Sequence, residues 1–530
     1  MRYIPWLISI LLVPIGGAIA IWLLFWGGML AGLAGLAATI GLYDVYQSKR
    51  AVLKNYPLSA RLRFLFEHFR PEIRQYFLES DHDETPFSRE QRALVYRRSK
   101  GIEGLRPFGT LRNVNAVGHE WINHSMSPSH MGDIAFRQPI GGPDCTQPYD
   151  SSALNISGMS YGALSPTAIE ALNWGAKLGG FAHTTGEGSI SRFHRKHGGD
   201  LIWQIGSGYF GCRTATGAFD PEMFVTNASD PQIKMIEIKL SQGAKPGHGG
   251  ILPGAKVTEA IAEARGVLVG QDCISPAAHS EFSSPDGLCR FIARLRHLSG
   301  GKPVGLKLCV GHPWEVFAMV KAFHETGITP DFITIDGAEG GTGAAPVEFA
   351  DHKGAPIREG LMLVHNSLVG MGLRDRVRLI ASGKIISAFD MCRMFALGAD
   401  GCNIARGFMF AVGCIQAQVC HSGKCPTGVT SQDPGRYRAI VVAEKHLRVA
   451  SYHRNTLFAL KEAVESSGLQ RPQEFTPHHL MIRVNSREVR SAASQYLWLE
   501  PGELLGGHVS HPAFAKYWDH ARPDTFAFAP

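Results

Sequence analysis

The sequence predicts an α/β fold: a (β/α)₈ TIM barrel with an N-terminal transmembrane helical hairpin and a helical C-terminal extension. Three observations lead to this prediction. The chain has 530 residues, of which 45% are hydrophobic and 19% charged, which suffices for one large domain with appendages. From about residue 151, eight short apolar runs alternate with helix-like segments, the pattern of parallel βα units. Residues 4–43 contain no charged side chain.

The apolar N-terminal tract is long enough for two membrane spans of about 20 residues each. We expect a tight hairpin over residues 1–46 that breaks near Trp26. Positive charge on both flanks favours an inner (cytoplasmic) membrane location with the barrel facing the cytoplasm. A cleaved signal peptide and a single tilted span are the alternatives. The flanking basic residues are Arg2 before the tract and Lys49, Arg50, Lys54, Arg61 and Arg63 after it.

Charge and cysteine usage exclude some classes of protein. The net charge of +7 is spread among acids and aromatic residues, so the sequence predicts no nucleic-acid partner. Ten cysteines are dispersed except for one group near residue 420, which favours a reduced, metal-binding compartment over a secreted disulfide framework.

The rest of the chain divides into three parts. Residues 47–150 are predicted to form a polar helical lead-in, residues 151–435 the barrel, and residues 436–530 a helical capping extension. The predicted barrel strands cover residues 154–160, 181–185, 200–206, 235–241, 304–310, 332–338, 377–383 and 402–408.

Glycine-rich loops follow the last three predicted strands. Barrels commonly bind a phosphate group after strands seven and eight, through backbone N–H groups. Tight turns without a ligand are the alternative. A separate glycine motif, GSGYFG at 206–211, matches a dinucleotide fingerprint but lacks the surrounding βαβ unit, so we reject a nicotinamide site there. The candidate phosphate-binding residues are Gly340, Gly341, Thr342, Gly343, Ser382, Gly383 and Gly401.

Lys307 lies within an apolar predicted strand, so we expect its ammonium group to point into the barrel. A lysine is rarely buried without a partner. It either stabilises an anionic cofactor ring or forms a salt bridge in the core.

Three cysteines, Cys414, Cys420 and Cys425, have the spacing C-x5-C-x4-C, and a proline follows the last one. Soft thiolates grouped in this way select an iron–sulfur cluster or zinc. Structural zinc prefers four ligands and closer pairs, and His421 is awkwardly placed as a fourth ligand. We therefore expect an iron–sulfur cluster with three protein ligands. Zinc and reduced structural cysteines are the alternatives.

These motifs together resemble the FMN-binding synthase domain of the glutamate synthase family, over roughly residues 150–435. The resemblance implies FMN, a three-iron four-sulfur cluster (3Fe-4S) on the three cysteines, and reductive formation of L-glutamate from 2-oxoglutarate. It is carried by SGMSYGALSP, LGGFAHTTGEG, QIGSGYFG, IKLSQGAKPGHGGILPG, ISPAAHSEFSSPDGL, GLKLCV, DGAEGGTGAAP and CIQAQVCHSGKCPTGV.

The resemblance also implies roles for particular residues. Glu187 matches the active-site carboxylate that handles the proton of ammonia or of the imine. Gln242 and Lys245 match the 2-oxoglutarate contacts, with Arg265 a further candidate. Lys245 is also expected to act in catalysis, because a dianionic keto acid needs cations. The flavin-ring contacts would be Ser157, Met159, Ser160, Gln204 and Lys307, and the phosphate contacts would be the Gly340–Gly343 loop and Ser382–Lys384.

The expected partners follow from what the chain does not contain. No glutaminase domain fits within 530 residues, so nitrogen is expected as free ammonia, from a separate glutaminase, or as another amine that gives an N-substituted glutamate. Electrons are expected from ferredoxin, a flavoprotein reductase or a membrane-associated donor.

Two other functions remain open. One is another FMN-barrel enzyme such as a hydroxy-acid oxidase, for which His183 and His279 are available. The other is a membrane-anchored electron carrier or sensor without catalytic activity.

Overall fold

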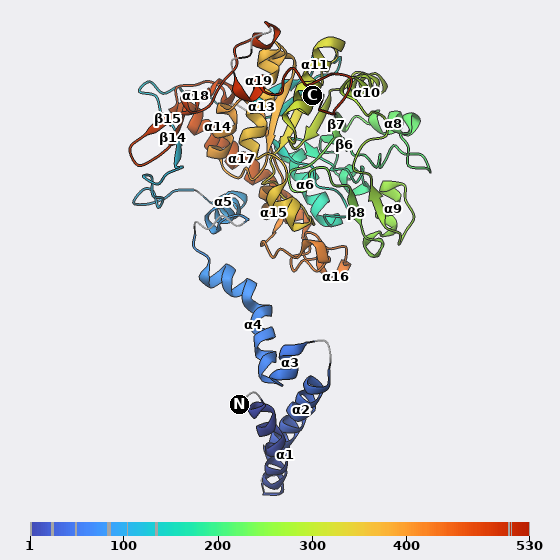
Figure 1. The fold of residues 1–530 in the computed structure, drawn as a ribbon, viewed down its shortest axis with the longest axis vertical. Coiled ribbons are helices and arrows are strands. Elements are labelled where there is room, and N and C mark those ends of the chain that lie inside the picture. Colours follow the sequence, from blue (N-terminus) through green and yellow to red (C-terminus); the bar gives the residue numbers. More distant parts are fainter. Residues whose placement is uncertain are drawn as a thin grey trace. The chain divides into compact units, whose positions relative to one another are not determined.

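The chain forms two compact units in the computed structural model, residues 1–89 and residues 90–530 (Figure 1). Each unit is described by itself. The structure describes residues 3–22, 26–47, 50–81, 86–102, 104–132, 136–506, 509 and 511–528.

The larger unit is built on a closed barrel of eight parallel strands, and all eight predicted strands are confirmed. Each barrel strand pairs with the next barrel strand along the chain, including β7 with β10. The last strand, β13, pairs with the first, β4, and closes the ring. The strands are β4 (Leu154–Ile156), β5 (His183–Thr184), β6 (Leu201–Ile205), β7 (Ile233–Lys239), β10 (Val304–Leu308), β11 (Phe332–Asp336), β12 (Arg378–Ser382) and β13 (Gly401–Ile404).

Several strands are shorter than predicted at their carboxyl ends. The predicted strand 402–408 ends at Ile404, because helix α15 (Arg406–Val412) begins two residues later. β6, β10 and β11 are buried along their whole length, as expected for strands covered on both faces. Their uniform burial explains why these runs are apolar without alternation.

Helices follow the strands and surround the barrel (Figure 1). The first, α6, shows how local sequence sets its bounds: Ser165 caps the N-terminus, Pro166 follows it, and Gly180 ends the helix in the left-handed conformation. The surrounding helices are α6 (Pro166–Gly179), α7 (Arg192–Arg195), α8 (Pro221–Ala228), α10 (Pro285–Leu298), α11 (Pro313–Thr326), α13 (Ile357–Gly370), α14 (Ala388–Ala396) and α15.

A long excursion separates β7 from β10. It contains a two-stranded antiparallel ribbon, which supplies residues to the pocket described below. Its elements are β8 (Gly250–Leu252), η2 (Gly254–Lys256), α9 (Glu259–Arg265) and β9 (Cys273–Ser275), and the excursion ends with α10.

The opposite, amino-terminal end of the barrel is closed by a hairpin of β2 (Arg137–Ile140) and β3 (Tyr149–Ser152). Ile140 and Tyr149 of this hairpin join barrel residues such as Ile202 and Phe332 in one buried apolar cluster. This cluster closes the amino-terminal end of the barrel, so a ligand can enter only from the carboxyl ends of the strands.

The C-terminal extension is helical at first, as predicted. Helix α17 (Val442–Ser466) packs along α6, with Val449 against Gly175. The remainder includes strands that the prediction lacked: β14 (Leu480–Arg483) pairs with β15 (Val489–Ser491) and with β1 (Glu120–Ile122) of the lead-in. The small elements are α12 (Val347–His352), η3 (Arg374–Arg376), η4 (Cys420–Ser422), α16 (Pro434–Tyr437), η5 (Pro472–Glu474), α18 (Ala492–Gln495), η6 (Glu503–Leu505) and α19 (Pro512–Ala515).

The predicted lead-in, residues 47–150, is divided between the two units. Its helices, α3 (Ala51–Asn55), α4 (Ser59–Ile73), the π-helix η1 (Arg74–Leu78) and α5 (Arg89–Ser99), end at Ser99. Beyond that point the described residues are mostly irregular with short strands. The helical lead-in is therefore shorter than predicted.

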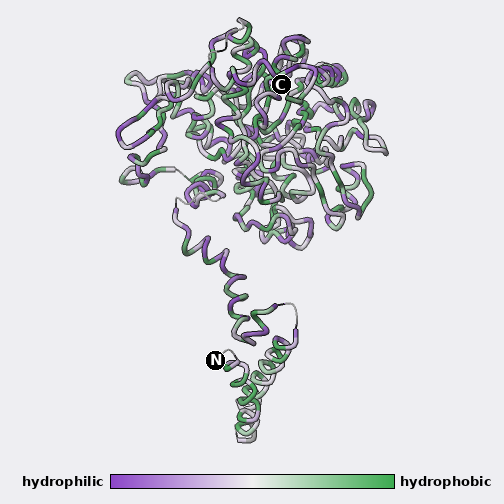
Figure 2. The backbone as a smooth tube through the Cα atoms, in the orientation of Figure 1, coloured by the Kyte–Doolittle hydropathy of each residue, from purple (hydrophilic) through white to green (hydrophobic). Residues whose placement is uncertain are grey.

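The smaller unit contains a pair of antiparallel apolar helices, α1 (Ile4–Trp22) and α2 (Trp26–Tyr46), which stand out as a hydrophobic segment in Figure 2. The Trp6 indole N–H donates to the Ala38 carbonyl at 3.1 Å, and a side chain at Gly41 would overlap Trp6. The connection at residues 23–25, and the predicted flanking residues Arg2 and Lys49, lie outside the described residues. Among those described, α2 is long and apolar enough to cross a membrane, and Ile4–Ile19 is a shorter apolar helix.

Candidate active site

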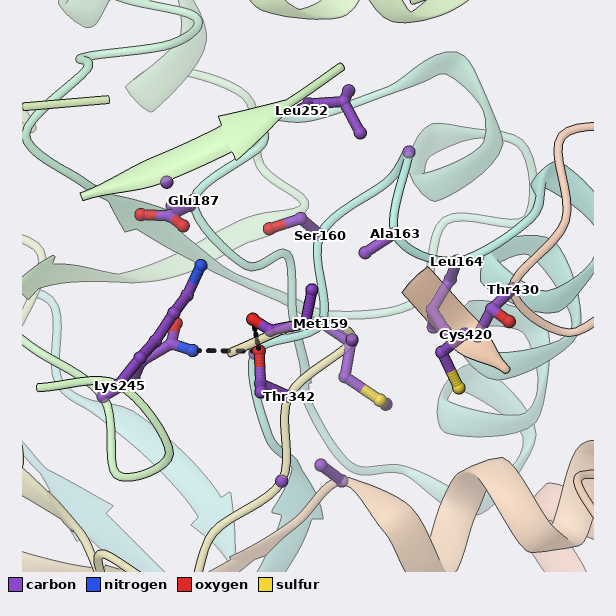
Figure 3. A pocket seen from close by; sticks show the side chains of 18 of the residues that line it. Met159, Ser160, Ala163, Leu164, Glu187, Lys245, Leu252, Thr342, Cys420 and Thr430 are labelled. Carbon is purple, nitrogen blue, oxygen red and sulfur yellow. Dashed lines mark hydrogen bonds between the residues drawn. The ribbon is translucent and has the colours of Figure 1, made fainter. Parts of the chain in front are cut away.

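A pocket of about 430 Å³ opens at the carboxyl ends of the barrel strands, where barrel enzymes place their chemistry. Figure 3 shows Glu187 and Lys245 on one side of it and Cys420 on the other, with Met159 and Thr342 between them. The predicted residues that line it are Met159, Ser160, Glu187, Gln204, Gln242, Lys245, Arg265, Lys307, Gly341, Thr342, Gly343 and Cys420.

Glu187 forms an ion pair that the sequence analysis missed. Its Oε1 lies 3.0 Å from Nζ of Lys239, the last residue of β7. The same ammonium group donates to Oε1 of Gln242 at 2.6 Å, and Nε2 of Gln242 approaches the Thr342 hydroxyl at 3.4 Å. The signal in the sequence was a lysine within a predicted barrel strand, the same feature that singled out Lys307.

Surrounding cations set the ionisation of Glu187. Burial by itself would raise the pKa of this carboxyl group, but Lys239, Arg265 and Lys245 together hold it below its ordinary value. Burial lowers the pKa of Lys245, and the Glu187 charge opposes that shift. Glu187 is therefore a carboxylate at neutral pH. Figure 3 shows the Lys245 side chain reaching toward it.

Arg265, the last residue of α9, is buried at the edge of the pocket. Its guanidinium group donates to the Tyr161 carbonyl at 3.1 Å and lies over the Phe210 ring. These contacts fix its orientation before any ligand binds.

Beneath the pocket, Lys307 points into the barrel, as predicted, and forms the buried salt bridge that was the alternative reading. Its Nζ lies 3.6 Å from Oδ2 of Asp336 and 3.5 Å from the Ser157 hydroxyl. The Ser382 hydroxyl donates to Oδ1 of Asp336 at 2.8 Å, and Ser157 and Ser382 lie 3.2 Å apart. Ser157 and Ser382 are thus part of a buried polar network and do not line the pocket.

A second buried network supports Gln204. Its Nε2 donates to Oε2 of Glu237 at 2.5 Å, and the Thr334 hydroxyl donates to Oε1 of the same carboxyl group at 2.7 Å. Burial raises the pKa of Glu237 despite the nearby Lys307 ammonium group. The buried Glu237 carboxyl group, itself held by Thr334, therefore fixes the orientation of the Gln204 amide at the pocket floor.

The predicted phosphate-binding residues are only partly brought together. Gly341, Thr342 and Gly343 line the pocket, whereas Gly340, Gly383 and Lys384 do not. Gly401 is at the amino end of β13, the opposite end of the barrel, so its inclusion was wrong. It precedes the predicted strand 402–408, and in a parallel barrel only residues that follow a strand reach the carboxyl-end rim.

The sequence analysis also missed Arg406, which follows β13 at the pocket edge. Its guanidinium group donates to the Thr342 carbonyl and lies beside Gly341, where an added Cβ would be 2.5 Å from Nε. The absence of a side chain at Gly341 leaves room for this cation. Arg406 therefore offers a positive charge to the glycine loop.

The three clustered cysteines lie in the loop after α15. Cys414 and Cys425 are buried, and Cys420 is partly exposed and lines the pocket. Burial raises the pKa of Cys414 to about 11, and the Cys420 and Cys425 thiols contribute to the shift. Burial would also raise the pKa of Cys425, but hydrogen bonds from Thr427 and Thr430 hold it below its usual value.

Two features show that this loop is constrained. Gln416 and Gln418 have φ angles of 60° and 57°, a left-handed conformation that is costly for residues with a side chain. The Tyr96 hydroxyl of α5 donates to the Cys414 carbonyl at 2.7 Å. Within the described part of the chain, no group of three or more His, Cys, Asp or Glu side chains is close enough to hold a single metal ion. In an iron–sulfur cluster, however, each cysteine binds a different iron atom.

The two histidines available to a hydroxy-acid oxidase do not line the pocket. His183 is fully buried in the barrel wall, and burial lowers its pKa to about 3. His279 bonds the Tyr209 hydroxyl and the Lys239 carbonyl.

Comparison with known sequences decides the family. Residues 147–470 match the family described as "Conserved region in glutamate synthase". The chain belongs to the glutamate synthase family. The match extends past the predicted barrel end at residue 435 and includes α17.

Relatives within the glutamate synthase family differ in how much they share. The glutamate synthase large subunit-like protein YerD of Bacillus subtilis is 37% identical over 489 residues, covering 84% of this chain and 93% of YerD. The archaeal-type glutamate synthase [NADPH] of Thermotoga neapolitana is 35% identical over 59% of each chain. The glutamate synthase [NADPH] large chain of B. subtilis is 36% identical over 52% of this chain and 17% of its own length.

Solved structures give weaker likenesses. A flavocytochrome b2 mutant with pyruvate bound is 11% identical with a TM-score of 0.40, covering 85% of this chain and 91% of that one. An (S)-mandelate dehydrogenase mutant is 14% identical with a TM-score of 0.43, covering 74% and 98%. Likenesses of this size do not distinguish one class of barrel enzyme from another.

Proposed function

We propose that this member of the glutamate synthase family is an FMN- and iron–sulfur-dependent oxidoreductase that forms L-glutamate, or an N-substituted glutamate, from 2-oxoglutarate and ammonia or an amine. One observation carries the proposal: a single pocket joins the Glu187–Lys239–Lys245 group to Cys420 of the cysteine loop. The two groups lie on opposite sides of the pocket and leave space between them (Figure 3).

The residues around that space fit FMN. Gln204 and Lys307 offer polar groups at the pocket floor, Met159 and Ser160 line one wall, and Arg406 beside Gly341 offers a cation to a phosphate. Ser382 would support the site through Ser157 and Asp336 from below. When bound there, FMN would supply a hydride to the substrate carbon.

The cations at the other side fit a dianionic keto acid. Lys245 and Arg265 would bind its carboxylates, and Gln242 would orient it by hydrogen bonding. Lys239 would hold both Glu187 and Gln242 in position, since it contacts both. The fixed guanidinium group of Arg265 reduces the entropy lost on binding.

Glu187 would handle the proton of the amine. As the amine nitrogen bonds to the carbonyl carbon, the Glu187 carboxylate carries two protons in turn from nitrogen to oxygen. The first transfer gives a carbinolamine, and the second lets the oxygen leave as water. The lowered pKa of Glu187 keeps it ready to accept a proton at neutral pH. The product of this step is a carbon–nitrogen double bond that accepts the hydride.

Cys414, Cys420 and Cys425 would hold the 3Fe-4S cluster. Cys420 lines the pocket, so a cluster there would lie next to the bound flavin and pass it electrons. The donor would be ferredoxin, a flavoprotein reductase or a membrane-associated protein.

We also propose that α1 and α2 anchor the chain in the inner membrane with the barrel in the cytoplasm, which the length and apolarity of α2 support.

The test is to purify the full chain anaerobically and quantify flavin, iron and sulfide alongside its visible spectrum. The chain is then reduced chemically and given 2-oxoglutarate with isotope-labelled ammonia. We expect labelled glutamate. Bound cofactors without amine incorporation would favour an electron carrier or sensor, and flavin reduction by a hydroxy acid would favour an oxidase.

A further inference from the structure

The smaller unit exposes an apolar stripe along α4 that nothing in the proposed reaction uses. Leu62, Phe66, Phe69 and Ile73 recur at helical spacing, and Leu65 flanks them. All are exposed, Phe66 to 63%. The stripe continues into η1, where Tyr76, Phe77 and Leu78 are exposed. Phe and Leu make up most of it, and both are typical of the buried face of helices that lie in a membrane interface.

A row of arginines runs along one edge of this stripe. Arg63, Arg70 and Arg74 follow one another at intervals of seven and four residues, so they share one flank of the helix. Together with Phe66 and Ile73 they line a groove. Arg63 pairs with Glu67 at 2.9 Å, whereas Arg70 and Arg74 form no ion pair within the described residues.

The start of α4 is fastened to the end of the apolar hairpin. Asp44, near the end of α2, is fully buried, and it accepts from Nη2 of Arg61 at 2.6 Å and from Nε at 2.9 Å. The Leu58 backbone N–H donates to the same carboxylate at 3.2 Å. This clamp holds the first turn of α4 at the level where the hairpin ends.

The opposite face of α4 is the one that packs within the unit. Ala60 is buried, and Phe64 lies under the Arg50 guanidinium group at 4.6 Å. The apolar stripe therefore points away from the packed side.

We propose that the stripe Leu62–Leu78, with its arginine edge, docks on the anionic headgroup surface of the membrane that holds the hairpin. This inference rests on the proposed membrane anchor. Basic amphipathic helices bind such surfaces through buried apolar side chains and through attraction to anionic lipids. A second copy of this chain fits less well, because Pro71 and the change to a π-helix at Arg74 interrupt a straight helix–helix seam.

The experiment places a photo-crosslinking amino acid at single positions of the full chain, reconstituted in vesicles. Position Phe66 tests the stripe, and His68, exposed on another face of α4, is the matched control. With phosphatidylcholine–phosphatidylglycerol vesicles we expect lipid adducts at Phe66 and few at His68. Equal yields at the two positions, or adducts at Phe66 to a second copy of the chain, would overturn the proposal.

The arginine edge is tested by the triple variant Arg63→Gln, Arg70→Gln, Arg74→Gln. We expect lipid adducts at Phe66 to fall about fivefold or more on anionic vesicles, with little change on pure phosphatidylcholine. The control Arg438→Gln, Arg454→Gln, Arg487→Gln removes the same charge from exposed sites in the larger unit. An equal fall in the control contradicts the proposal. Alkaline carbonate extraction of the same samples reports on the hairpin separately.

Discussion

At the scale of single residues, Glu187 takes its properties from the cations around it. Lys239, Arg265 and Lys245 outweigh the effect of burial on its pKa. Because the pKa of Glu187 is lower in the folded state, its interaction with these cations stabilises the fold at pH values above the ordinary pKa of a glutamate. That contribution is lost as the pH falls through the lowered value. The same carboxylate is the proposed base, so its environment serves both stability and catalysis.

Glu187→Gln should abolish most of the activity while the cofactors stay bound. An amide cannot accept the amine proton, so we expect kcat to fall by about 10²–10⁴-fold. Glu170→Gln is the matched control, since Glu170 also pairs with cations, Lys196 and His197, but does not line the pocket. Steady-state amination assays measure both. Full activity in E187Q would remove Glu187 from the mechanism.

Lys239→Met should shift the pH dependence of the reaction. Without this cation, burial has more weight and raises the pKa of Glu187, so the acid limb of the kcat/KM profile should move to higher pH. Lys234→Met changes a lysine in the same strand that pairs instead with Asp200 at 3.7 Å, and its profile should stay unchanged. If K239M lowers the rate equally at every pH, Lys239 does not set the ionisation of Glu187.

At the scale of elements, the site depends on loops held close by small residues and by long-range contacts. The loop after β7 passes so near β11 that a side chain at Gly243 would lie 1.8 Å from the Gly337 carbonyl oxygen. The Gly243 backbone N–H also donates to Asp336, which pairs with Lys307. The cysteine loop is held by Tyr96 of α5. The loop after β7 is therefore held to the buried Asp336–Lys307 pair, and the cysteine loop is held separately by α5.

Gly243→Ala should destabilise the barrel mouth, because the added methyl group overlaps backbone that cannot move independently. We expect a loss of about 1–3 kcal/mol in the free energy of unfolding. Thermal and denaturant unfolding would show it. Gly132→Ala, where an added Cβ meets nothing within 4 Å, should unfold like the wild type, and equal stability of both variants would contradict the close approach.

Cys420→Ser should lower the iron and sulfide content, because serine is a poor ligand for an iron–sulfur cluster. Flavin content should stay near that of the wild type, since the proposed flavin contacts lie elsewhere in the pocket. Metal analysis and visible absorption measure the two cofactors. Cys145→Ser, a partly exposed cysteine outside the loop, is the control. Stoichiometric zinc in place of iron would refute the cluster assignment.

At the scale of the whole molecule, two units carry different tasks. The larger holds the barrel and the pocket, and the smaller holds the apolar helix pair and α4. YerD matches 84% of this chain, whereas the T. neapolitana enzyme and the B. subtilis large chain match 59% and 52% of it. The family match, residues 147–470, contains all eight barrel strands and the cysteine loop.

The full chain should stay in the membrane fraction after alkaline carbonate extraction. Leu11→Lys with Leu36→Lys should release it, because a lysine in the middle of a span costs about 2.5–3.5 kcal/mol. Both leucines are exposed on the helix pair, so the change leaves the packing between α1 and α2 intact. Exposed Leu447→Lys with Leu497→Lys in the larger unit is the control. A wild-type chain released by carbonate would contradict the anchor.

Local pattern by itself was enough to predict much of this protein. The eight barrel strands and the two apolar N-terminal helices follow from periodicity along the chain. Each depends on residues close together in sequence, and burial imposes its pattern at that range. The motif resemblance also pointed to the family that the comparisons establish.

The tertiary structure alone decided which side chains meet. Glu187, after β5, meets Lys239 at the end of β7, two strands along the barrel, and Arg406 reaches Gly341 from 65 residues away. Gly401 is different, because its place before the predicted strand already put it at the amino end of the barrel. The physical reason is that closing the barrel brings the carboxyl ends of all strands to one rim. Neighbours on that rim are set by strand order and register, which no local pattern encodes.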